Sequence, residues 1–362
     1  MMLFPSVIIL LSVAAHVTKA NVITKSDVCK GGLCLPKHLC PTGKLEDGPI
    51  QQGELVTLNV DEENVCGDFM KKCCIGASSA DGGLIQEAQT ADVQCGSPVT
   101  SPLVYNVESN LTYANYGEFP WTVAIFNISF SANEMKLTLV GGGSLIHPKF
   151  VLTAAHTLKK PDRYVARFGE WSINSDAEMY PSQDIGIEEH IIHPSYRDSC
   201  LLENDIALAV LKRNVIYTEH IRPICLPSPT DVYDGQRCIA TGWGLDVRTQ
   251  QPAPIMKRIE LPVVPRDRCQ LLYRRAEVDY SFKLHRSMMC AGGEVGEDTC
   301  DQDGGTPLAC KKEDGSYVVA GITSWGLDCG RVDAPGIYVD VAKFACWIND
   351  TIEGYAELHA EE

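Results

Sequence analysis

A cluster of cysteines near the N-terminus constrains the fold of this chain more than any other feature. Its members are Cys29, Cys34, Cys40, Cys66, Cys73 and Cys74. The segment 21–76 that contains them is too short for hydrophobic burial alone to hold it together, so disulfides must supply much of its stability. Spacing alone does not fix their connectivity and leaves open a cystine-rich knot of another fold. A metal site is disfavoured in an oxidising compartment.

The first twenty residues predict export from the cell. The run from Leu3 to Val17 is mostly apolar but too short for a membrane span, and Thr18-Lys19-Ala20 offers small residues for cleavage. The alternative is a buried first strand or helix. Sixteen cysteines in an exported chain indicate disulfides, and no later stretch is apolar enough to span a bilayer. We therefore expect a secreted, soluble protein with a signal peptide at residues 1–20.

The charge of the chain excludes some classes of partner. Lys and Arg number 31 against 47 Asp and Glu, which gives a net charge of −16. Removal of residues 1–20 takes away one lysine and leaves −17. Such a charge opposes binding to nucleic acid and to acidic membranes. We expect neither among the partners, whereas basic proteins remain compatible.

Residues 77–116 predict a linker between the cysteine-rich segment and a larger domain. Ser78 to Gly83 is small and polar, and Ser97 to Pro102 adds turn formers. From 117 to 353, short apolar runs alternate with turn residues, which is typical of an all-β domain. The linker therefore joins a small module to a β domain.

The end of the chain predicts one hairpin and one helix. Asp314-Gly315 lies between two apolar runs and favours a hairpin turn. Apolar residues at helical spacing predict a terminal helix, which we expect to end near residue 353 before a frayed acidic tail at 354–362. They are Phe344, Trp347, Ile348 and Ile352.

The stretch from Cys300 to Cys310 carries the clearest chemical signal. It reads Cys-Asp-Gln-Asp-Gly-Gly-Thr-Pro-Leu-Ala-Cys and resembles the nucleophile loop of chymotrypsin-like serine proteases, Cys-x-Gly-Asp-Ser-Gly-Gly-Pro-Leu-x-Cys. Gly304 stands where the serine should be, and Gln302 and Thr306 replace glycines. Glycine has no hydroxyl and can neither attack a carbonyl nor form an acyl-enzyme. The resemblance implies a chymotrypsin-like double β-barrel, all-β, with a C-terminal helix.

Two further strands match those that carry the catalytic base and its carboxylate in that family. Val151 to His156 resembles the first, and Asn204 to Leu208 the second. In a working enzyme His156 would take the proton of the nucleophile and Asp205 would fix the His156 tautomer. With Gly304 in place, we favour the alternative that His156 and Asp205 are a polar pair in the cleft between the barrels. Gln302 at a glycine position also argues against a functional oxyanion hole.

The resemblance also implies a specificity pocket. Asp298 lies where trypsin-like relatives place the carboxylate that receives a Lys or Arg side chain. Ser324-Trp325-Gly326 matches the wall strand that pairs with an extended peptide, and Gly336 leaves the pocket open. The alternative is a collapsed pocket, as in an unprocessed precursor, with Asp298 merely solvated.

The chain lacks the activation site of active relatives. No Lys or Arg occurs between Lys72 and Lys136, so a trypsin-like protease has nothing to cut before Gly117. Without a new N-terminus, Asp303 is expected to lack the buried ammonium that organises the oxyanion hole in the family. A regulatory cut is instead expected in or near the cysteine-rich module.

The cysteine-rich module, with its closing Cys73-Cys74 pair, resembles the clip domain of arthropod serine proteases and their homologues. A bridge that the family places beside the base histidine is absent, because Gly141 and Thr157 occupy both positions. Cys200 and Cys346 remain and form the last pair by elimination. The full set of expected bridges is Cys29–Cys73, Cys34–Cys66, Cys40–Cys74, Cys95–Cys225, Cys238–Cys310, Cys269–Cys290, Cys300–Cys329 and Cys200–Cys346.

Two kinds of modification or ligand site complete the predictions. Asn110, Asn127 and Asn349 begin N-glycosylation sequons. Glu170 and Glu178 flank a loop that binds calcium in some relatives, so calcium at this loop stays open as an alternative, although a calcium site needs several oxygen ligands and two carboxylates are weak evidence for one. We expect no cofactor and no metal.

Together, the cysteine-rich module and the altered nucleophile loop make the chain resemble the arthropod clip-domain serine protease homologues. Such homologues are non-catalytic adaptors, cofactors or regulators in the extracellular cascade that activates prophenoloxidase and leads to melanisation in innate immunity. Clip-domain proteases and prophenoloxidase are the partners that this implies. Two alternatives remain open: a decoy or inhibitor of melanisation, such as a venom or secretory protein, and a residual serine-type endopeptidase.

Overall fold

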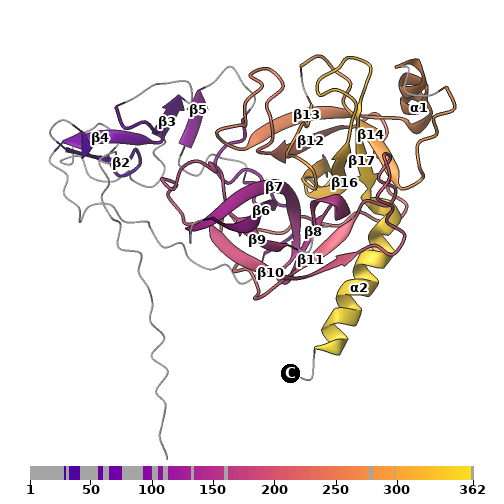
Figure 1. The fold of residues 1–362 in the computed structure, drawn as a ribbon, viewed down its shortest axis with the longest axis horizontal. Helices are drawn as coiled ribbons and strands as arrows, with labels where there is room; N and C mark the ends of the chain where they lie inside the picture. The colour runs from indigo at the N-terminus through magenta and orange to yellow at the C-terminus, as the bar shows by residue number, and fades with distance from the viewer. Residues whose placement is uncertain are drawn as a thin grey trace, which may run out of the picture.

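The computed structural model describes residues 28–29, 32–40, 56–59, 65–75, 93–99, 105–108, 113–131, 134–158, 162–276, 280–296 and 298–359. Two closed six-stranded barrels form its body, a small sheet lies at one end, and a long helix crosses the other (Figure 1). The expected double barrel with a C-terminal helix and a disulfide-rich N-terminal region is confirmed. The proposed signal peptide, residues 1–20, and Asn110 lie outside the described residues.

The first barrel closes in the order β10-β11-β8-β7-β6-β9. Its strands are β6 (Thr122–Ser131), β7 (Glu134–His147), β8 (Phe150–Thr153), β9 (Arg163–Phe168), β10 (Gln183–Ile192) and β11 (Ala207–Leu211). Every neighbouring pair is antiparallel. The barrel interior is filled by aliphatic and aromatic side chains such as Val123, Leu145 and Phe168.

The second barrel closes in the order β12-β13-β14-β17-β16-β15. Its strands are β12 (Arg237–Gly242), β13 (Lys257–Val264), β14 (Met288–Ala291), β15 (Pro307–Lys311), β16 (Tyr317–Trp325) and β17 (Gly336–Asp340). The expected hairpin joins β15 to β16, with Gly315 at φ +89° and Asp314 accepting from the Ser316 N–H. Buried and half-buried residues alternate along β13, so one face of this strand points into the barrel.

The N-terminal sheet consists of β1 (Val28–Cys29), β2 (Gly32–Pro36) and β4 (Lys71–Ile75), all antiparallel. A second, two-stranded sheet pairs β3 (Val56–Asn59) in parallel with β5 (Tyr105–Glu108). Since β3 belongs to the cysteine-rich segment and β5 to the predicted linker, the linker is not a simple spacer. Its strand ties the N-terminal module to the rest of the chain.

Aromatic packing explains why this part of the linker is ordered. Tyr105 is fully buried and stacks on Trp171 in the loop between β9 and β10, with ring centroids 5.6 Å apart. Its hydroxyl donates to the Ala177 carbonyl at 3.0 Å and bonds His38 Nδ1 at 2.6 Å. Burial lowers the pKa of His38 to about 4, which keeps this imidazole neutral near pH 7. The module and the barrel therefore share one core.

Two α-helices and two short 3₁₀ helices lie among the described residues: α1 (Arg266–Arg275), α2 (Ala345–Leu358), η3 (Ala155–Thr157) and η4 (Val341–Phe344). Helix α2 continues beyond residue 353, so the expected tail boundary is wrong. Tyr355 explains the extension, since its ring packs edge-on against Phe150 at 5.3 Å and stacks with His359. Neither helix of the described chain is long and apolar enough to cross a membrane.

Seven disulfides are formed: Cys29–Cys73, Cys34–Cys66, Cys40–Cys74, Cys95–Cys225, Cys238–Cys310, Cys269–Cys290 and Cys300–Cys329. These are pairs that the resemblance implied. The expected Cys200–Cys346 bridge is not formed, and both thiols are free and exposed. Helix α2 buries Ala345 and Ile348 against the body, which leaves Cys346 on the solvent side.

Candidate functional site

His156 and Asp205 meet in the cleft between the barrels. The short helix η3 follows β8 and carries His156, while Asp205 precedes β11. The imidazole Nδ1 lies 2.7 Å from Asp205 Oδ2, and the His156 backbone N–H donates to Oδ1 at 2.9 Å. Ser324 Oγ donates to Asp205 Oδ2 at 2.6 Å. The fully buried carboxylate thus fixes the ring orientation and has its charge shared by three donors.

The other ring nitrogen of His156 faces Gly304, where no hydroxyl exists. A Cβ built on Gly304 would meet His156 Nε2, so the imidazole occupies the space that a side chain would need. Gly141 and Thr157, which occupy the two cysteine positions of the bridge that is missing here, are also close together. A Cβ on Gly141 would lie 3.0 Å from Thr157 Cγ2. The Thr157 hydroxyl is 3.4 Å from the Gly304 carbonyl oxygen. Asp205 orients His156, and the residue that faces the other ring nitrogen of His156 carries no hydroxyl.

The loop around Gly304 keeps the backbone shape that glycine would favour. Gln302 has φ +72° and Gly305 has φ +87°. A left-handed conformation is unfavourable for a residue with a Cβ, so Gln302 is strained where glycine would not be. Thr306 holds the loop from the other side, because its hydroxyl donates to the Asp303 carbonyl at 2.7 Å and contacts Thr323 Oγ1 at 3.0 Å.

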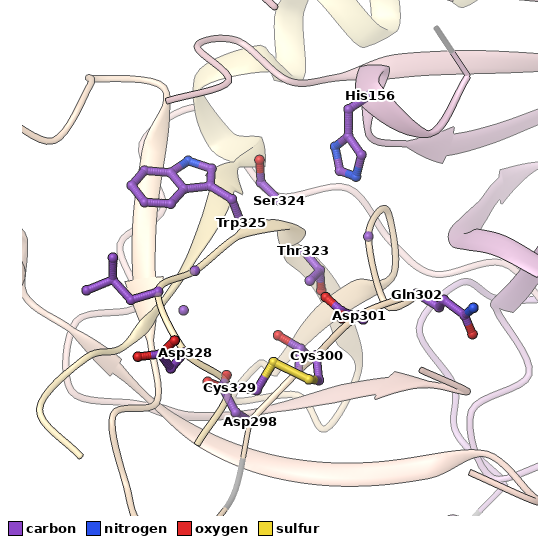
Figure 2. A pocket seen from close by; sticks show the side chains of 15 residues that line it. His156, Asp298, Cys300, Asp301, Gln302, Thr323, Ser324, Trp325, Asp328 and Cys329 are labelled. Carbon is purple, nitrogen blue, oxygen red and sulfur yellow. A yellow bond between two sulfur atoms is a disulfide. The ribbon is translucent and has the colours of Figure 1, made fainter. Parts of the chain in front are cut away.

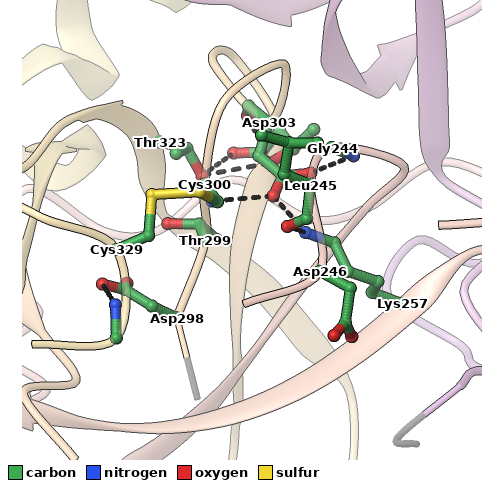
Figure 3. Close-up of polar contacts among 12 residues, drawn as sticks. Gly244, Leu245, Asp246, Lys257, Asp298, Thr299, Cys300, Asp303, Thr323 and Cys329 are labelled. Atoms are coloured by element: carbon green, nitrogen blue, oxygen red, sulfur yellow. Dashed lines mark hydrogen bonds and ion pairs between the residues drawn. A yellow bond between two sulfur atoms is a disulfide. The ribbon is translucent and has the colours of Figure 1, made fainter. Parts of the chain in front are cut away.

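Asp303 is paired with an ammonium, contrary to expectation. Lys257 Nζ lies 2.5 Å from Asp303 Oδ2 and also donates to the Leu245 carbonyl at 2.8 Å (Figure 3). Lys257 is 2% exposed and Asp303 is 0% exposed. The prediction failed because it considered only a cleaved N-terminus as the source of the charge. The alternation of β13 carried the missing signal, since Lys257 has the same parity as the buried Ile259 and Leu261.

A pocket of about 200 Å³ opens beside His156 and extends to Asp298 (Figure 2). Asp298 Oδ2 accepts from the Gly330 N–H at 3.0 Å, while Oδ1 is buried without a hydrogen-bond partner among the described residues. Burial raises the pKa of Asp298 to about 6, against the lowering effect of the Gly330 N–H. A buried carboxylate with one unpaired oxygen calls for a cation or donor from the pocket.

Two glycines keep this pocket open. A Cβ on Gly336 would lie 3.3 Å from Asp298 Oδ1 and 3.2 Å from the Tyr338 ring, and would narrow the approach to the carboxylate. A Cβ on Gly326 would meet nothing closer than Gly336 Cα at 3.9 Å. Trp325 forms part of the wall, with its ring edge-on to Tyr273 at 5.6 Å. The predicted pocket residues therefore lie together.

The side chains of Glu170 and Glu178 are buried in the protein. Glu170 accepts from the Trp171 N–H at 3.0 Å and Arg167 at 3.2 Å, and Glu178 accepts from the Ser172 N–H at 2.9 Å. Burial, and then the charge of Glu170, raise the pKa of Glu178 well above its ordinary value. No group of three or more potential metal-ligating side chains occurs among the described residues.

The two sequons within the described ranges lie on regular elements. Asn127 is half-buried on β6, and Asn349 is exposed on α2. Their modification stays a prediction.

Comparison with known proteins places the geometry in a family context. The Trypsin family model matches residues 110–348. The inactive CLIP domain-containing serine protease A8 of Anopheles gambiae is 51% identical over 90% of this chain and 90% of its own length. The inactive CLIP domain-containing serine protease A28 of the same species is 38% identical over 95% of each chain. Phenoloxidase-activating factor 2 of Galleria mellonella is 42% identical over 67% of this chain and 82% of its own length.

Proposed function

Because the chain belongs to the clip-domain serine protease homologues of the trypsin family, we propose that it is a secreted, non-catalytic adaptor of an extracellular proteolytic cascade. Residues 1–20 serve as its signal peptide in this proposal. Seven disulfides support an extracellular location, since such bridges persist in oxidising compartments.

One observation carries the non-catalytic half of the proposal: His156 Nε2 faces Gly304, which has no hydroxyl. A base that is oriented by Asp205 but lacks a nucleophile cannot form an acyl-enzyme. Loss of the nucleophile costs about 10⁶ in rate for enzymes of this mechanism.

The adaptor half of the proposal uses the Asp298 pocket. We assign it a Lys- or Arg-bearing segment of a partner protein, because the unpaired Oδ1 would accept from an ammonium or guanidinium. The wall strand Ser324-Trp325-Gly326 would pair with the backbone of that segment. Without acyl chemistry the segment is bound and released unchanged.

The clip module would supply the second contact. Its three bridges hold a rigid surface, and its shared core with the barrel fixes that surface relative to the pocket. Pre-organised surfaces lose little entropy on binding, and two modest contacts on one chain give avidity through effective concentration. We infer that the clip face supplies the principal contact.

The relatives indicate which cascade to test. Two matched proteins are named phenoloxidase-activating factors, from Galleria mellonella and Holotrichia diomphalia. We therefore propose clip-domain proteases and prophenoloxidase as the partners.

The direct test of the non-catalytic half is hydrolysis of an arginine ester by the purified protein. We expect no turnover above that of the buffer. Turnover that disappears in a His156→Ala variant would overturn the proposal and favour the residual endopeptidase. Turnover that persists in that variant would indicate a contaminating protease.

The adaptor half is tested by reconstitution from purified prophenoloxidase and its clip-domain protease. We expect the protein to raise phenoloxidase activity several-fold and Asp298→Asn to lose most of that effect. Glu313→Gln, on an exposed turn, is the matched control and should behave as the wild type. A fall in phenoloxidase activity on adding the wild type would instead support the decoy.

A further inference from the structure

The ion pair of Lys257 with Asp303 indicates that the pocket of this protein forms without proteolytic activation. We propose that Lys257 is a positioning residue that supplies, from within the uncut chain, the ammonium that Asp303 requires. This inference rests on the proposed use of the Asp298 pocket. It adds that the pocket forms without a proteolytic cut.

Several contacts hold Lys257 and Asp303 in fixed positions. Both side chains are buried, and Lys257 Nζ donates both to Asp303 Oδ2 and to the Leu245 carbonyl. The second oxygen, Oδ1, accepts from the Gly244 N–H at 2.8 Å. A buried carboxylate that loses its cation is left with an uncompensated charge, so removal of Lys257 would release Asp303 from this position.

The position of Asp303 is coupled to the pocket through the backbone. Asp303 Oδ2 also accepts from the Cys300 N–H at 2.9 Å, and Cys300 is bridged to Cys329. The next residue, Gly330, donates to Asp298 Oδ2. Lys257 thus holds one end of a continuous set of bonds, and the pocket carboxylate Asp298 lies at the other.

The uncut chain runs beside Lys257 in the same structure. Tyr113 forms an antiparallel bridge with Lys257, and the Ala114 N–H donates to the Met256 carbonyl at 2.9 Å. The Trp171 indole donates to the Ala114 carbonyl at 2.9 Å. Tyr113 and Ala114, which directly precede the Gly117 segment, therefore lie against the start of β13. The absence of Lys and Arg between Lys72 and Lys136 is consistent with a pocket that needs no cut there.

Fluorescence titration with p-aminobenzamidine, an aryl amidinium cation, tests the inference on the full-length uncut protein. We expect saturable binding by the wild type and at least tenfold weaker binding by Lys257→Met and Lys257→Gln. Lys257→Arg keeps the charge and should bind within about threefold of the wild type. Lys149→Met, which removes a partly exposed lysine paired with Glu188, is the matched control.

Amide hydrogen exchange distinguishes a local effect of Lys257 on the loop around Asp303 from unfolding of the whole protein. In Lys257→Gln we expect faster exchange at Cys300, Gly244 and Gly330, with protection kept in the first barrel. Unchanged exchange and unchanged probe affinity in a folded Lys257→Gln protein would overturn the inference. So would a wild type that binds the probe only after proteolytic cleavage.

The two proposals fail in different ways. A wild type that binds no probe, cut or uncut, contradicts the pocket function. The exchange data would still decide on Lys257, because they report the loop and not the ligand. Probe binding by the wild type with no effect of Lys257→Gln would leave the pocket function intact and remove the role of Lys257.

Discussion

Glycine at position 304 leaves the His156–Asp205 pair facing a residue without a hydroxyl. His156 and Asp205 keep their mutual hydrogen bonds, and Ser324 adds a third donor to the carboxylate. A buried carboxylate is costly unless it is paired, so these contacts are sufficient reason for the pair to persist as structure. Gly304 meanwhile lets the imidazole approach the loop backbone.

We predict that Gly304→Ser does not create an esterase. The new side chain would meet His156 Nε2, and the Gln302 conformation and Thr306 contacts would remain. An arginine-ester assay on the purified variant should show no turnover above the wild type. Turnover that is lost again in Gly304→Ser/His156→Ala would contradict the prediction.

The raised pKa of Asp298 predicts a pH dependence for cation binding. Only the ionised carboxylate attracts a cation, so p-aminobenzamidine affinity should fall about tenfold per pH unit below pH 6. Titrations between pH 5 and 8 measure this, and Asp298→Asn should bind the probe weakly at every pH. A flat profile in the wild type would contradict it.

The raised pKa of Asp298 also makes the stability of the folded protein depend on pH. Because the folded-state pKa of about 6 exceeds the ordinary value of 3.8, the folded protein holds this proton more tightly than the unfolded chain. Its contribution to stability is full below pH 3.8 and is lost as the pH rises through about 6. The Asp298 site therefore reduces the free energy of unfolding near neutral pH, where the proposed function requires its charge.

Among the elements, β5 and α2 depart most from what the sequence indicated. Strand β5 anchors the predicted linker to β3 and to Trp171, and α2 extends to Leu358. Both departures have one cause: an aromatic residue, Tyr105 or Tyr355, packs against the first barrel. Such long-range contacts override local composition.

We predict that Tyr105→Phe destabilises the protein by about 1–3 kcal/mol, because the buried His38 Nδ1 and Ala177 carbonyl each lose a partner. Ring burial and stacking on Trp171 would be kept. Urea unfolding followed by fluorescence measures the change. Tyr280→Phe, at an 87% exposed position, is the control, and an equal effect at both sites would contradict the prediction.

We predict that the native protein carries two titratable thiols per chain. Cys200 and Cys346 are both exposed and unbridged. A thiol assay without denaturant should find two, and Cys200→Ser/Cys346→Ser should abolish the signal. No reactive thiol before reduction would show that these cysteines are bridged after all.

At the scale of the molecule, particular residues show what sequence could predict. The Cys300–Cys310 loop and the cysteine spacings carried enough resemblance to indicate the two barrels, the clip module and the Asp298 pocket. The Lys257–Asp303 pair was missed, because its partners are far apart in sequence and lysine is usually exposed. The free Cys200 and Cys346 were missed because elimination assumes that every cysteine pairs.

The assembled molecule combines an oriented His156 that faces a glycine, an open pocket with an unpaired carboxylate oxygen, and a clip module that shares a core with the barrels. An enzyme must convert its substrate, release the product and bind the next substrate. An adaptor needs only to hold a partner in one orientation. This arrangement supports reversible capture of a basic segment.

The most direct measurement is the fate of a bound peptide. Uncut protein is incubated with a short arginine-containing peptide, binding is followed by calorimetry, and the peptide is then recovered for mass spectrometry. We predict saturable binding that p-aminobenzamidine displaces and Asp298→Asn abolishes, with the peptide recovered intact. Cleavage after the arginine that disappears in His156→Ala would contradict the account.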